Sequence, residues 1–371
     1  MRIFFLILFF FNFSTQVFPQ FSPKADSIIQ TGIHQIYSMQ FEDAYSTFDD
    51  LKKIEPKNPA GYFFDAMVLW WQILVDLRET RFDDLFYFKL NNVIKMCDEI
   101  LDENPTDYAG LYFKLGSLGF RGRLLSVRKK WFDSAMDGKD ALPLIIEIAK
   151  NYPEDKDIKL GFGLFNYYAD VIPKFFPFVK PLMYLFPKGD RELGLKQLAF
   201  VADSGKYAKY ETQYFLLQIY FDFEKNNNKA EYYCKRLLSE FPDNPKFENY
   251  LGRIYYRTRR FPQADSVFRS ILQKIKTGKT GYATKTNMRS DYYYLGALDY
   301  RMKDKTDEAI DFFKESLKIS YQIDENKKSG FIKNTYKYLI KLYQRKNDTE
   351  NVKYYKNLLE GIKKWWIQKN C

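Results

Sequence analysis

A spacing of small, aromatic and proline residues recurs along this chain and constrains its fold more than any other feature. A small residue is followed twelve positions later by alanine. An aromatic residue lies four positions after this alanine, and often a proline lies twelve positions after it. The pattern occurs in four places. The second place holds only the latter half of the pattern, and the last has one extra residue in the turn. The residues are Gly32, Ala44, Phe48, Leu51 and Pro56; Ala230, Cys234, Leu237 and Pro242; Leu251, Gly252, Tyr255, Ala264 and Phe268; Leu295, Gly296, Ala309, Phe313 and Ser316. This spacing is typical of repeated helix pairs, because short side chains let two helices cross closely and proline ends the second one.

The spacing resembles the tetratricopeptide repeat (TPR), a helix pair with a period of about 34 residues. Helix pairs can be placed almost end to end from residue 23, with proline-containing segments as stops between them. We therefore predict an all-α fold, a TPR-like alpha-alpha superhelix (solenoid) of about eight helix pairs over residues 21–371. In the third pair we expect helices at about 107–120 and 141–151, separated by a basic connector.

The first 20 residues have the anatomy of a secretory signal peptide. Arg2 precedes an apolar run over residues 3–11, and a polar stretch over residues 14–16 follows it. A helix that spans a membrane needs about 20 apolar residues, so this run is too short for a comfortable span. We expect residues 1–20 to direct export across the inner membrane of a bacterium, to the periplasm, the cell envelope or the outside. An uncleaved N-terminal anchor is the alternative.

A proline-rich apolar segment interrupts the repeats. Its prolines lie too close together for one unbroken helix: Pro173, Pro177, Pro181 and Pro187. We predict a hydrophobic excursion at residues 168–190 that folds into the inner groove and completes the core, with exposure to a partner or a bilayer as the alternative. After it, Asp190 can cap the next helix and Glu192 suits its first turn. Arg191 either binds an anion at this helix end or, as we favour, pairs with a carboxylate of a neighbouring helix.

Residues 157–198 also resemble a central motif of the eukaryotic tetratricopeptide-39 and inclusion-body-clearance family, approximately G-x-G-L-F, a proline, then G-x-x-G-D-R-E-x-G-L. The matching positions are Gly161, Gly163, Leu164, Phe165, Pro173, Gly189, Asp190, Arg191, Glu192, Gly194 and Leu195, whereas Phe186 replaces the first glycine of the second part. That family is a helical-repeat scaffold without established catalysis, so the resemblance implies architecture and no active site. The signal sequence departs from this mostly intracellular family, so its cellular roles are not carried over.

The chain offers few groups for catalysis. His34 is its one histidine, and the sequence holds no phosphate-binding loop and no Cys/His cluster with metal-ligand spacing. Three cysteines do not form a disulfide framework, and we expect Cys97 and Cys234 to be buried in helices. We therefore predict that the protein is not an enzyme and needs no cofactor and no metal.

The net charge of +11 is concentrated late in the chain, where residues 245–371 hold 28 Lys/Arg and 14 Asp/Glu. Lysines on solvated helix faces are the simpler explanation, and a basic surface for acidic protein or an anionic membrane surface is the alternative. We expect no nucleic acid partner for an exported protein. Trp365 and Trp366 follow two lysines in the last helix, a combination that either shields the final repeat or lies at a membrane interface.

Together these features predict a non-catalytic exported TPR scaffold that mediates protein–protein interaction by binding a protein or peptide. Stacked pairs curve so that their first helices form an extended inner surface. Late in the chain we predict that the partner-binding residues of this surface are Arg253, Tyr255, Arg257, Tyr292 and Tyr293. The alternative is an envelope or membrane-surface assembly component that uses the basic C-terminal third and the terminal tryptophan pair.

Overall fold

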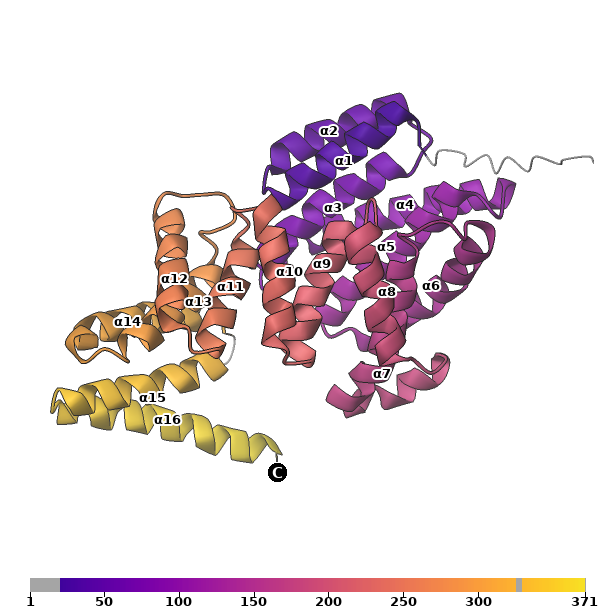
Figure 1. Cartoon of the computed structure of the whole chain (residues 1–371). Helices are drawn as coiled ribbons and strands as arrows, with labels where there is room; N and C mark the ends of the chain where they lie inside the picture. Colours follow the sequence, from indigo (N-terminus) through magenta and orange to yellow (C-terminus); the bar gives the residue numbers. More distant parts are fainter. Residues whose placement is uncertain (1–20, 325–328, 371) are drawn as a thin grey trace, which may run out of the picture.

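A computed structural model describes residues 21–324 and 329–370 of this chain, so the predicted signal peptide lies outside the described residues. Within them the regular structure is entirely helical, which confirms the predicted all-α solenoid of about eight pairs (Figure 1). The pairs are α1 (Pro23–Tyr37) with α2 (Phe41–Ile54), α3 (Ala60–Val75) with α4 (Asp83–Glu103), α5 (Tyr108–Val127) with α6 (Trp131–Asn151), α7 (Lys159–Phe175) with α8 (Arg191–Ser204), α9 (Lys209–Gln218) with α10 (Asn227–Glu240), α11 (Pro245–Arg257) with α12 (Phe261–Lys276), α13 (Lys285–Asp299) with α14 (Thr306–Ile323), and α15 (Gly330–Arg345) with α16 (Thr349–Asn370). Three shorter turns join them: the 3-10 turns η1 (Pro177–Leu185) and η3 (Lys303–Lys305) and the π-helical turn η2 (Ile219–Phe223).

Glycine–phenylalanine contacts hold three of the pairs together. In each, the ring from the second helix lies against a glycine of the first, so closely that a Cβ on Gly32 would come within 2.2 Å of Phe48. The three pairs are Gly32–Phe48, Gly252–Phe268 and Gly296–Phe313. Each ring also stacks on an aromatic residue of the next first helix: Phe48 on Phe64, Phe268 on Tyr294 and Phe313 on Tyr338, with centroids 5.4, 4.8 and 4.8 Å apart. One aromatic position therefore seals its own pair and joins it to the following one.

The third pair is longer than the sequence predicts. α5 continues to Val127 and α6 begins at Trp131, so the expected basic connector is helical almost throughout. Its arginines are neutralised by carboxylates of other helices: Arg121 by Asp137, Arg123 by Glu211 and Arg128 by Asp83, at 2.5, 2.6 and 2.5 Å. Because these charges are paired, the segment packs as helix instead of lying in solvent as a connector.

The proline-rich excursion differs from the prediction in two ways. α7 continues past residue 168 and ends at Phe175, two residues after Pro173, whose missing N–H removes a bond of the helix ladder close to its end. The excursion also does not fill the inner groove: of η1 only Val179 is buried, whereas Phe178 and Tyr184 are 59% and 93% exposed. The preferred interpretation was therefore wrong, because the prolines leave carbonyl groups without helical partners and water satisfies these at the surface. The segment rests instead on the start of α6, with the rings of Trp131 and Phe178 5.5 Å apart.

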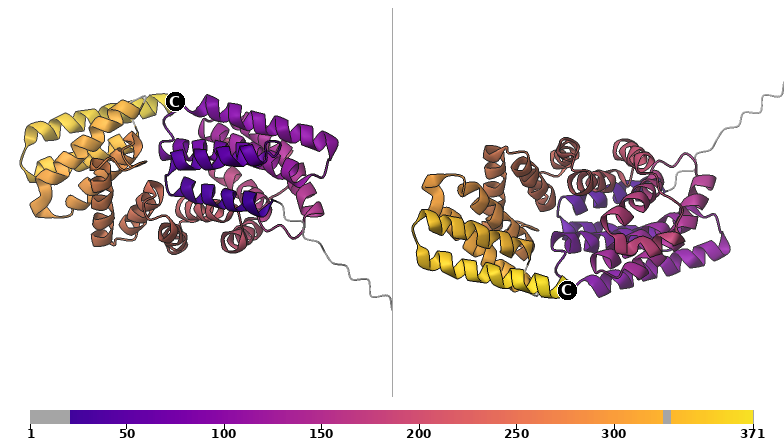
Figure 2. Two further views of the ribbon diagram at one scale, coloured as in Figure 1. Left: turned by 90° about the horizontal axis from the view of Figure 1, so that it is seen from above. Right: turned by 90° about the horizontal axis from the view of Figure 1, so that it is seen from below.

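The superhelix winds tightly enough for distant pairs to touch. Seen from above and from below, the first pairs, drawn in indigo, lie beside later pairs of the chain (Figure 2). The Tyr37 hydroxyl of α1 donates to Glu211 of α9 at 2.7 Å, and the Asn244 amide donates to the Tyr37 carbonyl at 2.9 Å. Further along, the Thr286 hydroxyl donates to Asp76 at 2.6 Å. The first two pairs thus pack against the fifth to seventh, which encloses the inner surface of the first half. None of the described helices has the length and apolar character needed to cross a membrane.

Candidate functional site

Three basic side chains lie along one face of α11, the first helix of the sixth pair. Lys246, Arg253 and Arg257 are seven and four residues apart, a spacing that places them on one stripe of a helix. Lys246 and Arg253 are half-buried and Arg257 is exposed. Among the described residues none of the three has an ion-pair partner. We call these three residues the α11 cation cluster.

The two arginines are held in place by aromatic rings and a carbonyl group. The Arg253 guanidinium lies 4.6 Å from the ring centroid of Phe221 and 5.1 Å from that of Tyr250. The Arg257 guanidinium lies 3.5 Å from the Phe221 ring and donates a hydrogen bond of 2.7 Å to the Phe221 carbonyl. Phe221 belongs to the π-helical turn η2, a type of irregularity that is frequent at functional sites. The guanidinium groups are therefore positioned without being neutralised.

The electrostatics of this face are set by burial and by nearby carboxylates. Burial lowers the pKa of Arg253, but Tyr250, Tyr294 and Asp222 outweigh it and leave the pKa above its ordinary value. Burial and, to a lesser extent, the charge of the neighbouring Arg253 lower the pKa of Lys246 to about 8, although Asp76 opposes the shift. Burial and the charge of Arg253 also lower the pKa of Arg257. A bound carboxylate would reverse both effects, because an opposite charge within about 4–6 Å favours the charged form. The site is thus suited to an anionic group.

The structure brings together only two of the five predicted partner-binding residues. Arg253 and Arg257 share Phe221, while the three tyrosines pack against other neighbours: Tyr255 under the Arg260 guanidinium at 4.5 Å, Tyr292 beside Phe312 at 6.1 Å, and Tyr293 beside Phe331 at 5.0 Å. Their role in binding stays a prediction. Sequence reasoning missed Lys246, although the spacing of basic residues along the helix could have identified it. Phe221 had no such signal, because it comes from the preceding pair.

The glycines of the motif around the excursion lie at close helix contacts. A Cβ on Gly194 of α8 would come within 2.8 Å of the Gly163 carbonyl oxygen of α7, so the two helices cross backbone to backbone. Gly161 faces α6, where a Cβ would meet Ile145 at 3.2 Å. Asp190 caps α8, because its carboxylate accepts the Leu193 amide hydrogen at 3.0 Å. These residues therefore position helices α6, α7 and α8.

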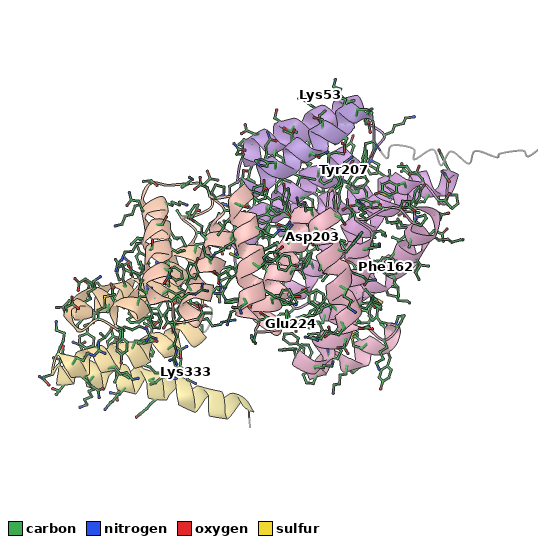
Figure 3. All side chains as sticks on the ribbon, viewed as in Figure 1. Lys53, Phe162, Asp203, Tyr207, Glu224 and Lys333 are labelled. Carbon is green, nitrogen blue, oxygen red and sulfur yellow. The ribbon has the colours of Figure 1, made fainter. Side chains whose placement is uncertain are left out.

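Arg191 forms an ion pair with a carboxylate of a neighbouring element. Its Nε donates to Glu224 at 2.9 Å, and its Nη1 also contacts Glu192. The Tyr167 hydroxyl donates at 2.8 Å to the same Glu224, which is labelled in Figure 3. Burial raises the pKa of Glu224, but the bonds from Arg191 and Tyr167 outweigh it and leave the pKa below its ordinary value. The pair therefore joins α7, α8 and the end of η2 in one polar contact.

The two internal cysteines lie where the sequence predicts them. Cys97 and Cys234 are buried, and burial raises the pKa of Cys97 to about 12, so its thiol is unreactive at neutral pH. In the part of the chain that the structure describes, no group of three or more His, Cys, Asp or Glu side chains could hold a metal ion. The side chains of Trp365 and Trp366 lie outside the described residues.

The sequence matches no family model and no curated protein. It is similar in structure to several solved TPR proteins. The human IFIT1 dimer with PPP-AAAA is 12% identical, with 88% of this chain and 69% of that chain covered and a TM-score of 0.41. The C-terminal part of a TPR repeat-containing protein from Cytophaga hutchinsonii is 12% identical, with 90% and 95% covered and a TM-score of 0.32. Yeast Tom70 is 14% identical, with 92% and 85% covered and a TM-score of 0.32. The resemblance to the tetratricopeptide-39 family stays a prediction.

Proposed function

We propose that this protein is a non-catalytic, exported scaffold that binds an acidic segment of a partner protein along the inner surface of its superhelix. The observation that carries the proposal is the α11 cation cluster, whose three charges have no ion-pair partner among the described residues. Guanidinium groups bind carboxylates through two parallel hydrogen bonds, and such charge-assisted bonds are about twice as strong as neutral ones. An acidic peptide would supply the negative charge that the site lacks.

A peptide-binding titration tests this function. A fluorescent peptide rich in Asp and Glu is titrated with the purified chain, beside the same peptide with Asn and Gln at those positions. We expect the acidic peptide alone to bind, and Arg253→Gln with Arg257→Gln to weaken it at least about tenfold, equivalent to about 1.4 kcal/mol. The matched control is Lys353→Gln with Lys356→Gln, which removes two exposed charges of α16 from the same basic third. Equal losses in both double variants would show that net charge, not the cluster, attracts the peptide.

Attachment to a membrane surface is the second candidate function, and the exposed excursion favours it. Phe175, Phe178 and Tyr184 are 50%, 59% and 93% exposed, and Lys180 and Lys188 beside them are exposed as well. Aromatic rings flanked by lysines suit the interface of an anionic bilayer.

Flotation with vesicles of phosphatidylglycerol, against vesicles of phosphatidylcholine, tests attachment to a membrane. The Phe178→Ser/Tyr184→Ser variant should lose flotation with anionic vesicles, whereas Phe88→Ser should not. Phe88 is the matched control because it is 62% exposed on α4, away from the excursion. An absence of flotation for the unchanged chain would exclude this candidate.

A further inference from the structure

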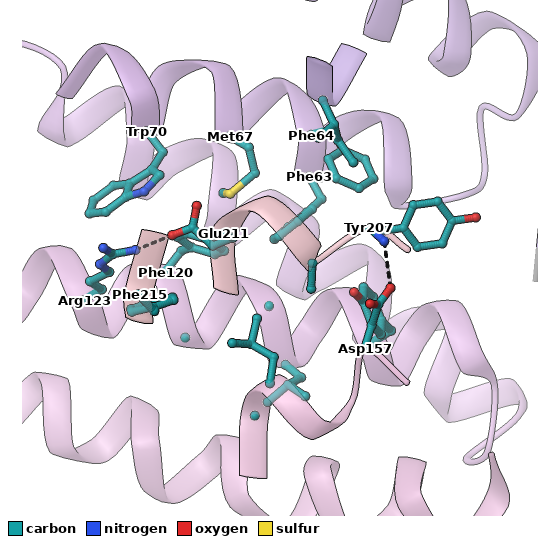
Figure 4. Close-up of a pocket in the computed structure, with 18 of the residues that line it drawn as sticks. Phe63, Phe64, Met67, Trp70, Phe120, Arg123, Asp157, Tyr207, Glu211 and Phe215 are labelled. Atoms are coloured by element: carbon teal, nitrogen blue, oxygen red, sulfur yellow. Dashed lines mark hydrogen bonds and ion pairs between the residues drawn. The ribbon is translucent and has the colours of Figure 1, made fainter. Parts of the chain in front are cut away.

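An apolar cavity of about 190 Å³ lies between the first helices of the first five pairs, apart from the α11 cation cluster (Figure 4). One stripe of α5 forms a wall, from Tyr112 through Gly116 and Gly119 to Arg123. Aromatic side chains from neighbouring helices form much of the rest, among them Phe63, Trp70 and Phe215. The cavity exists because the superhelix brings α1 and α3 against α9.

The charged groups at its two ends are already paired within the protein. At one end Arg123 donates to Glu211 at 2.6 Å, and its guanidinium lies over the Phe215 ring at 4.2 Å. At the other end Asp157 accepts the backbone amide hydrogens of Lys206 and Tyr207, both at 2.8 Å (Figure 4). The charged groups at both ends thus already have hydrogen-bond partners within the protein, so the interior between them suits an apolar chain.

One polar group in this wall has no partner. The Trp70 side chain is fully buried, and its indole Nε1 has no hydrogen-bond acceptor among the described residues. Buried donors are nearly always paired, and an unpaired one costs free energy that an incoming acceptor recovers. Trp70 lies at the Arg123 end, where the guanidinium stands 5.0 Å from its ring centroid. Because Nε1 itself is covered, a guest that carries a hydrogen-bond acceptor reaches it when a neighbouring side chain at this end moves aside.

The dimensions favour a chain over a ring. The α5 stripe from Tyr112 to Arg123 covers eleven residue steps, or about 16 Å of helix. A compact cavity of about 150 Å³ holds benzene. The cavity in this protein is only slightly larger, at about 190 Å³, and it extends along this stripe, so it is slender. Gly119, one turn before Arg123, is exposed, and no atom lies within 4 Å of where its Cβ would be. The cavity thus has an open flank at the Arg123 end.

We propose that this cavity binds one unbranched alkyl chain of medium length, with its hydrogen-bond-accepting head group at Trp70 and the opening beside Gly119. The ligand class is a linear amphiphile such as a fatty acid or a fatty alcohol, or the acyl chain of a single-chain phospholipid. The site shares no residue with the α11 cation cluster, so it stands apart from the peptide-binding proposal.

Titration of the purified, delipidated chain with 1-decanol, decanoic acid and indole tests the site, with tryptophan fluorescence and calorimetry as readouts. We expect both linear compounds to bind with a Kd below about 100 µM and indole not to bind. Decanoyl lysophosphatidylcholine distinguishes two sources of the alkyl chain. If it binds, a membrane lipid can supply the chain, and if it does not bind, the ligand is a free amphiphile. Both results support the cavity as a chain site, whereas no binding of either linear compound, or equal binding of indole, overturns it.

Two variants locate the binding. Gly119→Leu should fill the cavity and abolish binding, whereas Gly361→Leu, the same change at another unobstructed helical glycine, should leave binding unchanged. Trp70→Phe keeps an aromatic ring but removes the donor, and should weaken 1-decanol about fivefold, the effect of one net hydrogen bond. Circular dichroism confirms that each variant is folded. Full binding by folded Gly119→Leu, or by Trp70→Phe, would refute the assigned site.

Discussion

The ring of Phe268 on α12 lies against Gly252 on α11, so that a Cβ at Gly252 would come within 2.7 Å of the ring. Ala264, one turn before Phe268 on α12, is fully buried, whereas Ser266 is exposed. The two helices of this pair therefore meet at Gly252 and Ala264, and a larger side chain at either position must displace packed atoms.

We predict that Gly252→Leu and Ala264→Leu each lower the free energy of unfolding by about 1–3 kcal/mol, because extra methylene groups overpack the contact. Ser266→Leu, which adds a comparable side chain two residues from Ala264, should cost well under about 1 kcal/mol. Chemical denaturation compares the three variants. If Ser266→Leu were as damaging as Ala264→Leu, the assignment of buried and exposed positions on α12 would be wrong.

A buried carboxylate on α13 should make stability depend on pH. Asp291 is fully buried, and neither of its oxygens has a hydrogen-bond partner among the described residues. Burial raises its pKa well above the ordinary value, Arg269 opposes this shift and Glu248 adds to it. The folded state therefore takes up a proton at a higher pH than the unfolded state, and this contribution to stability decreases as pH rises from about 4 through the raised pKa.

We predict that Asp291→Asn is more stable than the unchanged chain at pH 7, by about 1–3 kcal/mol, because no charge is left without a partner. Its advantage should shrink as the pH falls through the raised pKa of Asp291, where the buried carboxylate takes up its proton. Urea denaturation at pH 5, 6 and 7 measures both proteins. Parallel pH curves would mean that Asp291 does not titrate differently in the folded state.

The pair of Arg191 and Glu224 should contribute measurably although Arg191 is partly exposed. We predict a coupling free energy of about 1 kcal/mol in a double-mutant cycle of Arg191→Met and Glu224→Gln, near the upper end for solvent-accessible pairs. The comparison is the exposed pair of Lys174 and Asp170, four residues apart on α7, which should couple by about 0.5 kcal/mol or less. If the coupling free energy of Arg191 and Glu224 were smaller than that of Lys174 and Asp170, the pair of Arg191 and Glu224 would not join α7, α8 and η2 as we propose.

The N-terminal segment should direct export. We predict that a chain without residues 1–20 stays in the cytoplasm of the host, whereas the full chain leaves it, because Arg2 and the apolar run over residues 3–11 have the sequence pattern of a signal peptide. Cell fractionation followed by immunoblotting measures both. Recovery of both proteins in the cytoplasm in equal amounts would overturn the proposed localisation.

The sequence by itself determined the positions of the helices in segments where the local periodicity is strong. The sequence places helix pairs from residue 23, and the first pair lies at Pro23–Tyr37 and Phe41–Ile54, because small and aromatic side chains at helical spacing act within one pair. The same spacing placed Gly252 and Ala264 correctly in the buried contact. The excursion was found through its prolines, which act on the backbone of their own segment.

Only the tertiary structure decided the course of the third pair, the position of the α11 cation cluster and the existence of the cavity. The helical course of residues 121–140 depends on Asp83 and Glu211, which lie outside the third pair and neutralise its arginines. The α11 cation cluster is positioned by Phe221 from the preceding pair. The cavity requires Tyr37 to reach Glu211, 174 residues further along the chain. The physical reason is that helix periodicity is encoded by neighbours within a few residues, whereas burial, charge pairing and enclosed space depend on how the whole superhelix winds.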